Sequence, residues 1–291
     1  MRVHLVDGTY ELFRYHFAMP SHVTADGQEV AATRGVLGTL FQLIDDGATH
    51  VAVATDHVIE SWRNNLYDDY KDGSGIDPVL FSQFPLIEEG MEAAGFKVWP
   101  MIEYEADDAL AAGAVMAAAD ERVEQVMICT PDKDLGQCVT EDARIVQYDR
   151  RKQQLIDHAA VIEKFGVPPE SIPDYLGLVG DTADGFPGLA GWGAKSTATV
   201  LQRYGRIEDI PLDVGKWDIT VRGGAKLAQT LADNLDMALL FRRIATVETD
   251  IEGLGTVDDL AWTGPTDAFA EFCARIDGER LVQRAAKLAP K

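Results

Sequence analysis

Short strand-like runs alternate with helical patterns along the first half of the chain, and this alternation constrains the fold more than any other feature. The strand-like runs lie at 2–6, 50–55, 96–99, 125–130 and 143–148, and the helical patterns lie at 9–17, 33–46, 78–94 and 104–119. Strands separated by helices are typical of a mostly parallel sheet that is covered on both faces. The pattern therefore predicts an α/β domain over residues 1–156.

The second half of the chain has a different pattern. Short helical stretches punctuated by Gly and Pro occupy 157–165, 169–178, 193–204, 223–243 and 265–288. We expect a helical subdomain over residues 157–291 that packs on the sheet and supplies part of the same site.

Composition narrows the class of protein. The chain is 46% hydrophobic and 25% charged, which is ordinary for a globular domain. No run approaches the ~18 apolar residues of a membrane span. The start of the chain lacks a signal-peptide pattern, and the three cysteines have no CxxC spacing. We therefore expect a cytoplasmic protein without a membrane partner.

The net charge of −22 argues against a nucleic-acid partner. The charge is unevenly distributed, however. Residues 104–142 hold ten acids and two bases, whereas residues 193–243 hold eight bases and six acids. Because salt screens charges beyond ~8–10 Å, a basic strip in the second half would permit binding to a nucleic acid.

Nine acidic residues stand at five places in the sequence, and most of these places fall where a strand-like run ends. They are Asp7, Asp56, Glu105, Asp107, Asp108, Asp132, Asp134, Asp181 and Asp184. Catalytic groups of open α/β sheets lie beyond the carboxyl ends of the strands. Converging carboxylates repel one another unless cations lie between them, and Mg²⁺ or Mn²⁺ accepts such oxygen ligands. The clusters therefore indicate metal-dependent phosphate chemistry.

Each acidic cluster also has a purely structural interpretation. Acids in a first helical turn complement the helix dipole by ~0.3–1 kcal/mol each, and Asp132-Lys133-Asp134 is also compatible with a solvated turn. Three acids in the four positions 105–108 exceed what capping needs. In the metal-binding interpretation, the two aspartates of the turn point toward a cation and Lys133 faces away.

The glycine-rich stretch 180–196 is the main candidate for contact with a phosphate backbone. Its glycines permit close backbone approach, and Gly191 and Gly193 could aim N–H groups at a phosphodiester. The match to a P-loop fails because Ala194 separates Gly193 from Lys195 and no strand precedes the stretch. A hairpin between helices that grips DNA fits better.

Aromatic and basic residues are mixed in the stretch 61–71. A solvated amphipathic helix is one interpretation of this stretch. In the functional interpretation, Arg63 and Lys71 hold phosphates while Tyr70 stacks on a base. Arg14, which follows Asp7 along a helical pattern, could reach the same site.

Five ordered motifs resemble the flap endonuclease and 5′→3′ exonuclease family, which includes the 5′-nuclease domain of bacterial DNA polymerase I. The motifs are Leu5-Val6-Asp7-Gly8 with Arg14, Asp56 with Arg63 and Tyr70-Lys71, Tyr104-Glu105-Ala106-Asp107-Asp108, Thr130-Pro131-Asp132-Lys133-Asp134-Leu135, and the stretch from Gly180 to Lys195. If the 291 residues are the whole protein, the absence of a polymerase domain predicts a stand-alone nuclease. The expected basic residue shortly after Lys71 is replaced by Asp72-Gly73-Ser74-Gly75, and Gly185 replaces a usual Asn.

The resemblance implies a PIN-like fold with a helix–three-turn–helix motif at about 176–205. It implies two-metal hydrolysis of DNA at 5′ flaps, nicks and 5′ ends by a monomer, in replication or repair. The nine acids would be ligands of two or more Mg²⁺ or Mn²⁺ ions, and K⁺ would bind at the hairpin motif. Arg14 and Lys71 would be catalytic. The DNA-binding residues would be Arg63, Tyr70, Gly188, Gly191, Gly193 and Lys195.

Three alternatives remain open at this point: a PIN-like ribonuclease, a non-catalytic DNA-binding protein that recognises DNA structure, and a small-molecule phosphatase. The long glycine hairpin disfavours the first, since gripping a duplex suits DNA structures. The nine mutually repelling acids disfavour the second, because without metal they would destabilise the fold.

Overall fold

The computed structural model describes residues 1–290 and divides them into two compact units. The first, which we call the sheet unit, comprises Met1–Ile59, Gly73–Thr130 and the described residues from Glu248 onward. The second, the helical unit, comprises Glu60–Asp72 and Pro131–Val247. Each unit is therefore assembled from separate stretches of the chain.

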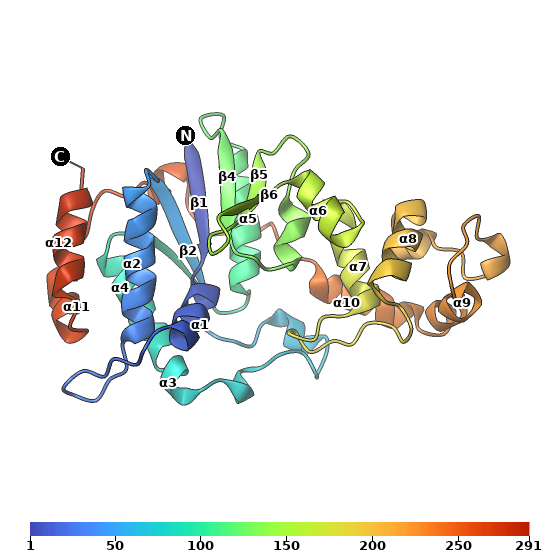
Figure 1. Cartoon of the computed structure of the whole chain (residues 1–291), viewed down its shortest axis with the longest axis horizontal. Coiled ribbons are helices and arrows are strands. Elements are labelled where there is room, and N and C mark those ends of the chain that lie inside the picture. Colours follow the sequence, from blue (N-terminus) through green and yellow to red (C-terminus); the bar gives the residue numbers. More distant parts are fainter. Residues whose placement is uncertain (291) are drawn as a thin grey trace. The chain divides into compact units, whose positions relative to one another are not determined.

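The sheet unit is built on four parallel strands in the order β3-β2-β1-β4, of which β1, β2 and β4 are labelled in Figure 1. Their bounds are β1 Arg2–Asp7, β2 His50–Asp56, β3 Lys97–Met101 and β4 Gln125–Cys129. Leu5 of β1 lies between Ala52 of β2 and Ile128 of β4, and all three are fully buried. Strands buried on both faces need helices on both sides, which explains the nearly continuous apolar runs in the sequence.

Helices of the sheet unit connect and cover these strands. Helix α5 packs against all four of them, and α1 and α4 contact β2 and β3 respectively. Gly113 of α5 allows this close approach, because a Cβ there would lie 2.5 Å from the Trp99 ring. The bounds are α1 Gly8–Ala18, α2 Ala31–Asp45, α3 Pro78–Phe81, α4 Gln83–Ala93, α5 Ala106–Ala118, α11 Phe269–Arg275 and α12 Glu279–Leu288.

The helical unit carries one antiparallel strand pair, β5 (Ile145–Asp149) and β6 (Gln154–Ile156), and five helices (Figure 1). Helices α7 and α10 pack together around a core that includes Phe186 and Phe241, whose rings stack at 5.5 Å. The helices are α6 His158–Phe165, α7 Ile172–Val179, α8 Ala194–Tyr204, α9 Gly224–Asp233 and α10 Leu235–Ala245.

These elements confirm the expected mostly parallel sheet flanked by helices, with three divided helices as the main difference. The pattern at 78–94 divides at Ser82, the pattern at 223–243 divides at Asn234, and the pattern at 265–288 is interrupted at 276–278. Asp277 adopts φ +50, a left-handed conformation that no helix continues through. Apolar periodicity persists across these breaks, so the sequence pattern did not reveal them.

The compact units divide the chain differently from the sequence domains 1–156 and 157–291, which remain a prediction. Residues near 260 return to the sheet unit, where Trp262 N–H donates to Thr49 O at 2.8 Å and the indole Nε1 donates to Ala94 O at 2.9 Å. In the part of the chain that is described, no helix is both long and apolar enough to cross a membrane.

Candidate metal centre and nucleic-acid interface

Two predicted site residues of the sheet unit lie at the carboxyl ends of neighbouring strands. Asp7 ends β1, where its carboxylate accepts hydrogen bonds from Tyr10 N–H at 2.8 Å and from the Thr130 hydroxyl at 3.0 Å. Asp56 ends β2 and accepts from Ala106 N–H at 2.8 Å, which joins this strand end to the start of α5. The parallel topology thus gathers these carboxylates at one edge of the sheet.

The three acids at the start of α5 differ in burial and in their contacts. Asp108 is fully buried, and its two oxygens accept from Glu105 N–H at 3.1 Å and from Glu248 N–H at 2.8 Å. These contacts are those of a buried cap that also fixes the chain near Glu248. Glu105 is buried as well, whereas Asp107 is partly exposed.

In the helical unit, three predicted ligands form what we call the acidic cluster. One carboxylate oxygen from each of Asp134, Asp181 and Asp184 lies within 4.8 Å of the others. Asp181 and Asp184 belong to a tight hairpin closed by hydrogen bonds of 2.8 and 3.0 Å between the backbones of Asp181 and Phe186. Asp132 is exposed, and its carboxylate accepts from Asp134 N–H at 3.0 Å.

Asp134 gives the clearest sign that the acidic cluster suits a cation. Among residues 1–290 its Oδ1 is buried without a hydrogen-bond partner. Burial, reinforced by Asp132, Asp184 and Asp181, raises the pKa of the Asp134 carboxyl well above its ordinary value. A buried carboxylate is costly unless it is paired, and a divalent cation with oxygen ligands would satisfy it. The donor set therefore fits Mg²⁺ or Mn²⁺.

Two lysines pair with the acidic cluster. Lys71 Nζ lies 2.9 Å from Asp184 Oδ1. Lys133 Nζ lies 2.7 Å from Asp181 Oδ2. The expectation that Lys133 faces away was wrong, because its flexible side chain reaches the acid on the neighbouring hairpin.

The backbone at position 185 requires glycine. It adopts φ +86, and a Cβ there would lie 2.4 Å from Asp69 O. The missing side chain lets the backbone at 69–71 lie against the hairpin, where Lys71 N–H donates to Asp184 O at 2.9 Å.

The other predicted cations and the aromatic residue make different contacts from those expected. Arg14 forms an ion pair with the buried Glu11 and lies over the Tyr15 ring. Arg63 is only 3% exposed, and it donates to Ile244 O at 2.8 Å and to Thr246 O at 3.1 Å. Tyr70 is 4% exposed within the core of the helical unit.

These burials bear on two expectations about the stretch 61–71, which remain predictions. Arg63 lies as an internal anchor for the end of α10, and Tyr70 lies in the core of the helical unit. The stretch contains the 3₁₀ segment η1 (Trp62–Asn65), and two of its aromatic residues, Tyr67 and Tyr70, pack into the apolar core of the helical unit. The sequence pattern of an amphipathic surface helix concealed this.

The glycines at 180 and 188 have a structural function. Both adopt positive φ, and a Cβ on Gly188 would lie 2.3 Å from Gly180 N. Their backbones therefore cross in direct contact. Gly191 also has positive φ, whereas Gly193 caps α8 with open space around its Cβ position.

Lys195, just inside α8, lines a cavity of about 500 Å³. Arg222, which precedes α9, lines it too, together with Ser196, Thr199, Thr220 and Val221. Across the described residues, neither Lys195 nor Arg222 forms an ion pair. Sequence reasoning missed Arg222, although the basic stretch 193–243 contained the signal.

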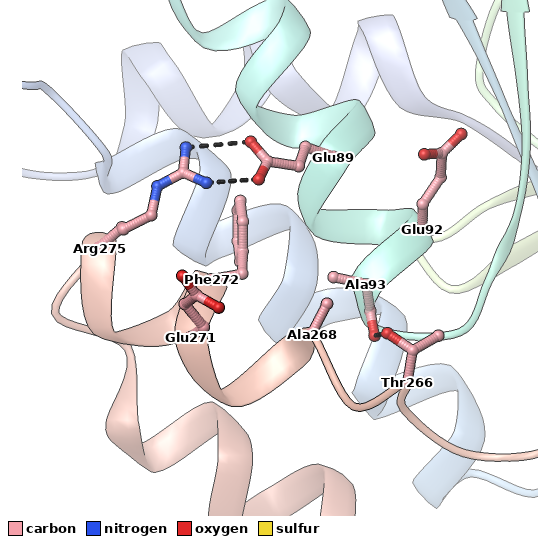
Figure 2. Close-up of a pocket in the computed structure, with 8 residues that line it drawn as sticks. All are labelled: Glu89, Glu92, Ala93, Thr266, Ala268, Glu271, Phe272 and Arg275. Atoms are coloured by element: carbon pink, nitrogen blue, oxygen red, sulfur yellow. Dashed lines mark hydrogen bonds and ion pairs between the residues drawn. The ribbon is translucent and has the colours of Figure 1, made fainter.

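A cavity between α4 and α11 has the opposite character (Figure 2). Glu89, Glu92 and Glu271 line it, and Arg275 is paired with Glu89. Such a carboxylate-rich wall repels a phosphodiester, and the predicted site includes no residue of this cavity.

Comparison with known proteins settles the family. A model of the 5′-3′ exonuclease N-terminal, resolvase-like domain matches residues 2–166, and a model of the 5′-3′ exonuclease C-terminal SAM fold matches residues 167–268. The chain belongs to the 5′-3′ exonuclease family. This confirms the resemblance stated on the five motifs.

Two relatives illustrate the range of this exonuclease family. The chain is 36% identical over 210 residues to a 5′-3′ exonuclease of Aquifex aeolicus, covering 72% of this chain and 71% of the relative. It is 30% identical over 267 residues to DNA polymerase I of Bacillus caldotenax, covering 89% of this chain and 29% of the polymerase. The chain thus spans less than a third of the length of that polymerase.

Solved structures of low sequence identity share the exonuclease fold. The T5 D15 protein co-crystallised with metal ions aligns with TM-score 0.66 at 16% identity, covering 99% of this chain and 98% of that one. The catalytic core of Rad2 in complex with DNA substrate aligns with TM-score 0.64 at 14% identity, covering 99% and 92%. These likenesses confirm the α/β fold with a helical C-terminal part.

Proposed function

We propose that this exonuclease hydrolyses DNA phosphodiesters at 5′ flaps, nicks and 5′ ends in a reaction that requires Mg²⁺ or Mn²⁺, in replication or repair. The acidic cluster supports the proposal most strongly, because Asp134 keeps a buried carboxylate oxygen that no group among the described residues satisfies. Family membership makes phosphodiester hydrolysis the reaction that fits such a cluster. The T5 D15 protein, crystallised with metal ions, gives independent support.

The nine predicted acids would hold the ions: Asp7, Asp56, Glu105, Asp107 and Asp108 in the sheet unit, and Asp132, Asp134, Asp181 and Asp184 in the helical unit. Bound divalent ions supply an activated water and stabilise charge on the attacking and leaving oxygens. Asp108 also fixes the start of α5, since both of its oxygens accept backbone hydrogen bonds.

Among the cations, Lys71 is best placed to neutralise charge on the reacting phosphate, because its ammonium already lies beside the acidic cluster. Arg14 would have to exchange its Glu11 partner for a phosphate oxygen. We therefore assign the larger role to Lys71 and keep Arg14 as a second cation.

Duplex binding is assigned to the helical unit. The N-terminus of α8 with Gly191, Gly193 and Lys195 would present backbone N–H groups and one ammonium, and Arg222 adds a second cation at the same cavity. Gly193 N–H donates to Ser196 Oγ at 3.2 Å and would have to exchange this partner for a phosphate oxygen. The Rad2 core bound to DNA substrate supports a DNA ligand for this fold. A K⁺ ion at this hairpin and a monomeric state are further predictions.

A labelled 5′-flap oligonucleotide, incubated with and without Mg²⁺ or Mn²⁺, tests the proposal. Cleavage should require the ion and should be lost in Asp134→Asn. Asp142→Asn is the matched control, because Asp142 is exposed and caps a turn in the same unit. A gel shift without cleavage would favour a non-catalytic DNA-binding protein. Cleavage confined to RNA would favour a ribonuclease, and hydrolysis of p-nitrophenyl phosphate instead of DNA would favour a phosphatase.

A further inference from the structure

Lys133 contacts the acidic cluster from a position between two of the predicted acidic ligands in sequence. It is flanked in sequence by Asp132 and Asp134, and its ammonium ends 2.7 Å from Asp181 on the separate glycine-rich hairpin. The Asp181 side chain is only 4% exposed, whereas that of Lys133 is 34% exposed. The ammonium therefore neutralises a buried acid while one flank of the lysine remains open to solvent.

The contact between Lys133 and Asp181 reduces the net negative charge of the acidic cluster. Three carboxylates form the cluster, and the ammonium groups of Lys71 and Lys133 pair with two of them. Uncompensated carboxylates at this separation would destabilise the folded chain. The two lysines thus let the cluster form before any ion arrives, while Asp134 Oδ1 stays buried without a hydrogen-bond partner among residues 1–290.

A divalent ion bound by Asp181 would interact with the same negatively charged carboxylate that Lys133 now neutralises. We propose that Lys133 is an internal counter-ion that competes with the divalent ion for the acidic cluster and leaves Asp181 when the ion binds. The inference rests on the proposed metal-dependent function. It adds that the ion requirement of this enzyme is set partly by a lysine of its own sequence.

Lys71 differs from Lys133 in this respect. Its backbone N–H is hydrogen-bonded to Asp184 O at 2.9 Å, so its segment stays beside the hairpin whether or not its ammonium is paired. Lys133 is the lysine whose removal tests competition without touching the cation that we assign to the phosphate.

The test measures Mn²⁺ binding to the intact chain without DNA, by the electron paramagnetic resonance signal of unbound Mn²⁺. Lys133→Met should bind Mn²⁺ about tenfold more tightly, because it loses a positive charge within a few ångströms of the ion. Lys133→Arg keeps the charge and should bind as the native chain does. Lys152→Met is the matched control, since Lys152 pairs with Asp149 in the same unit and is 69% exposed.

A thermal unfolding series provides a second readout. In EDTA, Lys133→Met should unfold at a lower temperature than the native chain, and Mn²⁺ should raise its midpoint by more than it raises the native one. Unchanged or weaker Mn²⁺ binding by Lys133→Met would overturn the inference alone. Failure of the native chain to bind Mn²⁺ would overturn the proposed function together with the inference.

Acylation of the native chain keeps the inference testable if Lys133→Met does not fold. An ion-paired lysine is protected from an amine-reactive ester, so mass spectrometry should find Lys133 labelled faster with Mn²⁺ than in EDTA, while labelling of Lys152 stays constant. Equal or slower labelling of Lys133 in Mn²⁺ would contradict displacement of its ammonium.

Discussion

At the residue scale, Asp134 is an acid whose surroundings disfavour its charged form. Burial and neighbouring carboxylates raise its pKa well above the ordinary value. A carboxyl group with a raised folded-state pKa binds more protons when folded, so its favourable contribution is present below the unfolded-state pKa and is lost as pH rises through the folded-state pKa. In EDTA at about pH 7, the buried Asp134 carboxyl therefore destabilises the folded chain.

Replacing Asp134 by Asn removes that titration and nearly preserves shape. We expect Asp134→Asn to unfold in EDTA at a higher temperature than the native chain at about pH 7. The difference should shrink toward about pH 4, the ordinary range of an aspartate. Scanning calorimetry across this pH range measures it. A variant that is less stable than the native chain at every pH would contradict the burial argument.

Arg63 is expected to act through stability rather than through contact with DNA. Its guanidinium satisfies the carbonyl oxygens of Ile244 and Thr246 inside the helical unit. Arg63→Met should lower the free energy of unfolding by about 2–4 kcal/mol, because buried acceptors lose their donors. Urea denaturation measures this. Arg275→Met, which breaks the exposed pair with Glu89, should cost no more than about 1 kcal/mol.

The opposite result for Arg63 would restore its sequence-based role. If Arg63→Met left stability unchanged and weakened binding of a duplex, the side chain would have to be a phosphate contact. The sequence alone could not decide between the two roles, because a basic residue beside aromatic residues suits either a buried anchor or a nucleic-acid surface.

At the element scale, the crossing of Gly180 and Gly188 positions the hairpin that carries Asp181 and Asp184. Gly188→Ala should destabilise the chain by about 2–3 kcal/mol, since its Cβ would meet backbone and its φ is positive. Gly193→Ala is the matched control, with a negative φ and no atom within 4 Å of the added Cβ. Thermal unfolding of the two variants separates them. Equal stability would mean that the crossing relaxes without cost.

Most secondary-structure elements and the positions of the acidic residues could be predicted from the sequence. The side chains that these acids contact could not. Asp7 and Asp56 directly follow short apolar runs. Such runs can be recognised from neighbouring residues alone, so the positions of these two acids at strand ends could be predicted. The contact of Lys133 with Asp181 joins residues far apart in the chain, and no local pattern encodes it. Three-residue β6 and the helix break at Asn234 were missed because they are shorter than the periodicity that reveals an element.

At the scale of the whole molecule, discontinuous assembly explains why a single sequence boundary does not reproduce the compact units. The stretch Glu60–Asp72 supplies aromatic residues to the core of the helical unit, and the described residues from Glu248 onward complete the sheet unit. Long-range packing of this kind carries no compositional mark at the points where the chain passes from one unit to the other.

Because the chain has a net charge of −22, the proposed contact with DNA depends on where cations without an ion-pair partner gather. Lys195 and Arg222 line one cavity without ion-pair partners among residues 1–290, so each is able to displace a counter-ion from a phosphate. Lys195→Gln and Arg222→Gln should each weaken duplex binding regardless of sequence and reduce the slope of log affinity against log salt by about one. Fluorescence anisotropy in EDTA, across a salt series, measures both effects.

Arg275→Gln should leave the slope unchanged, because Arg275 is already paired with Glu89 (Figure 2). A native slope in both Lys195→Gln and Arg222→Gln would show that the duplex backbone is held elsewhere on the molecule.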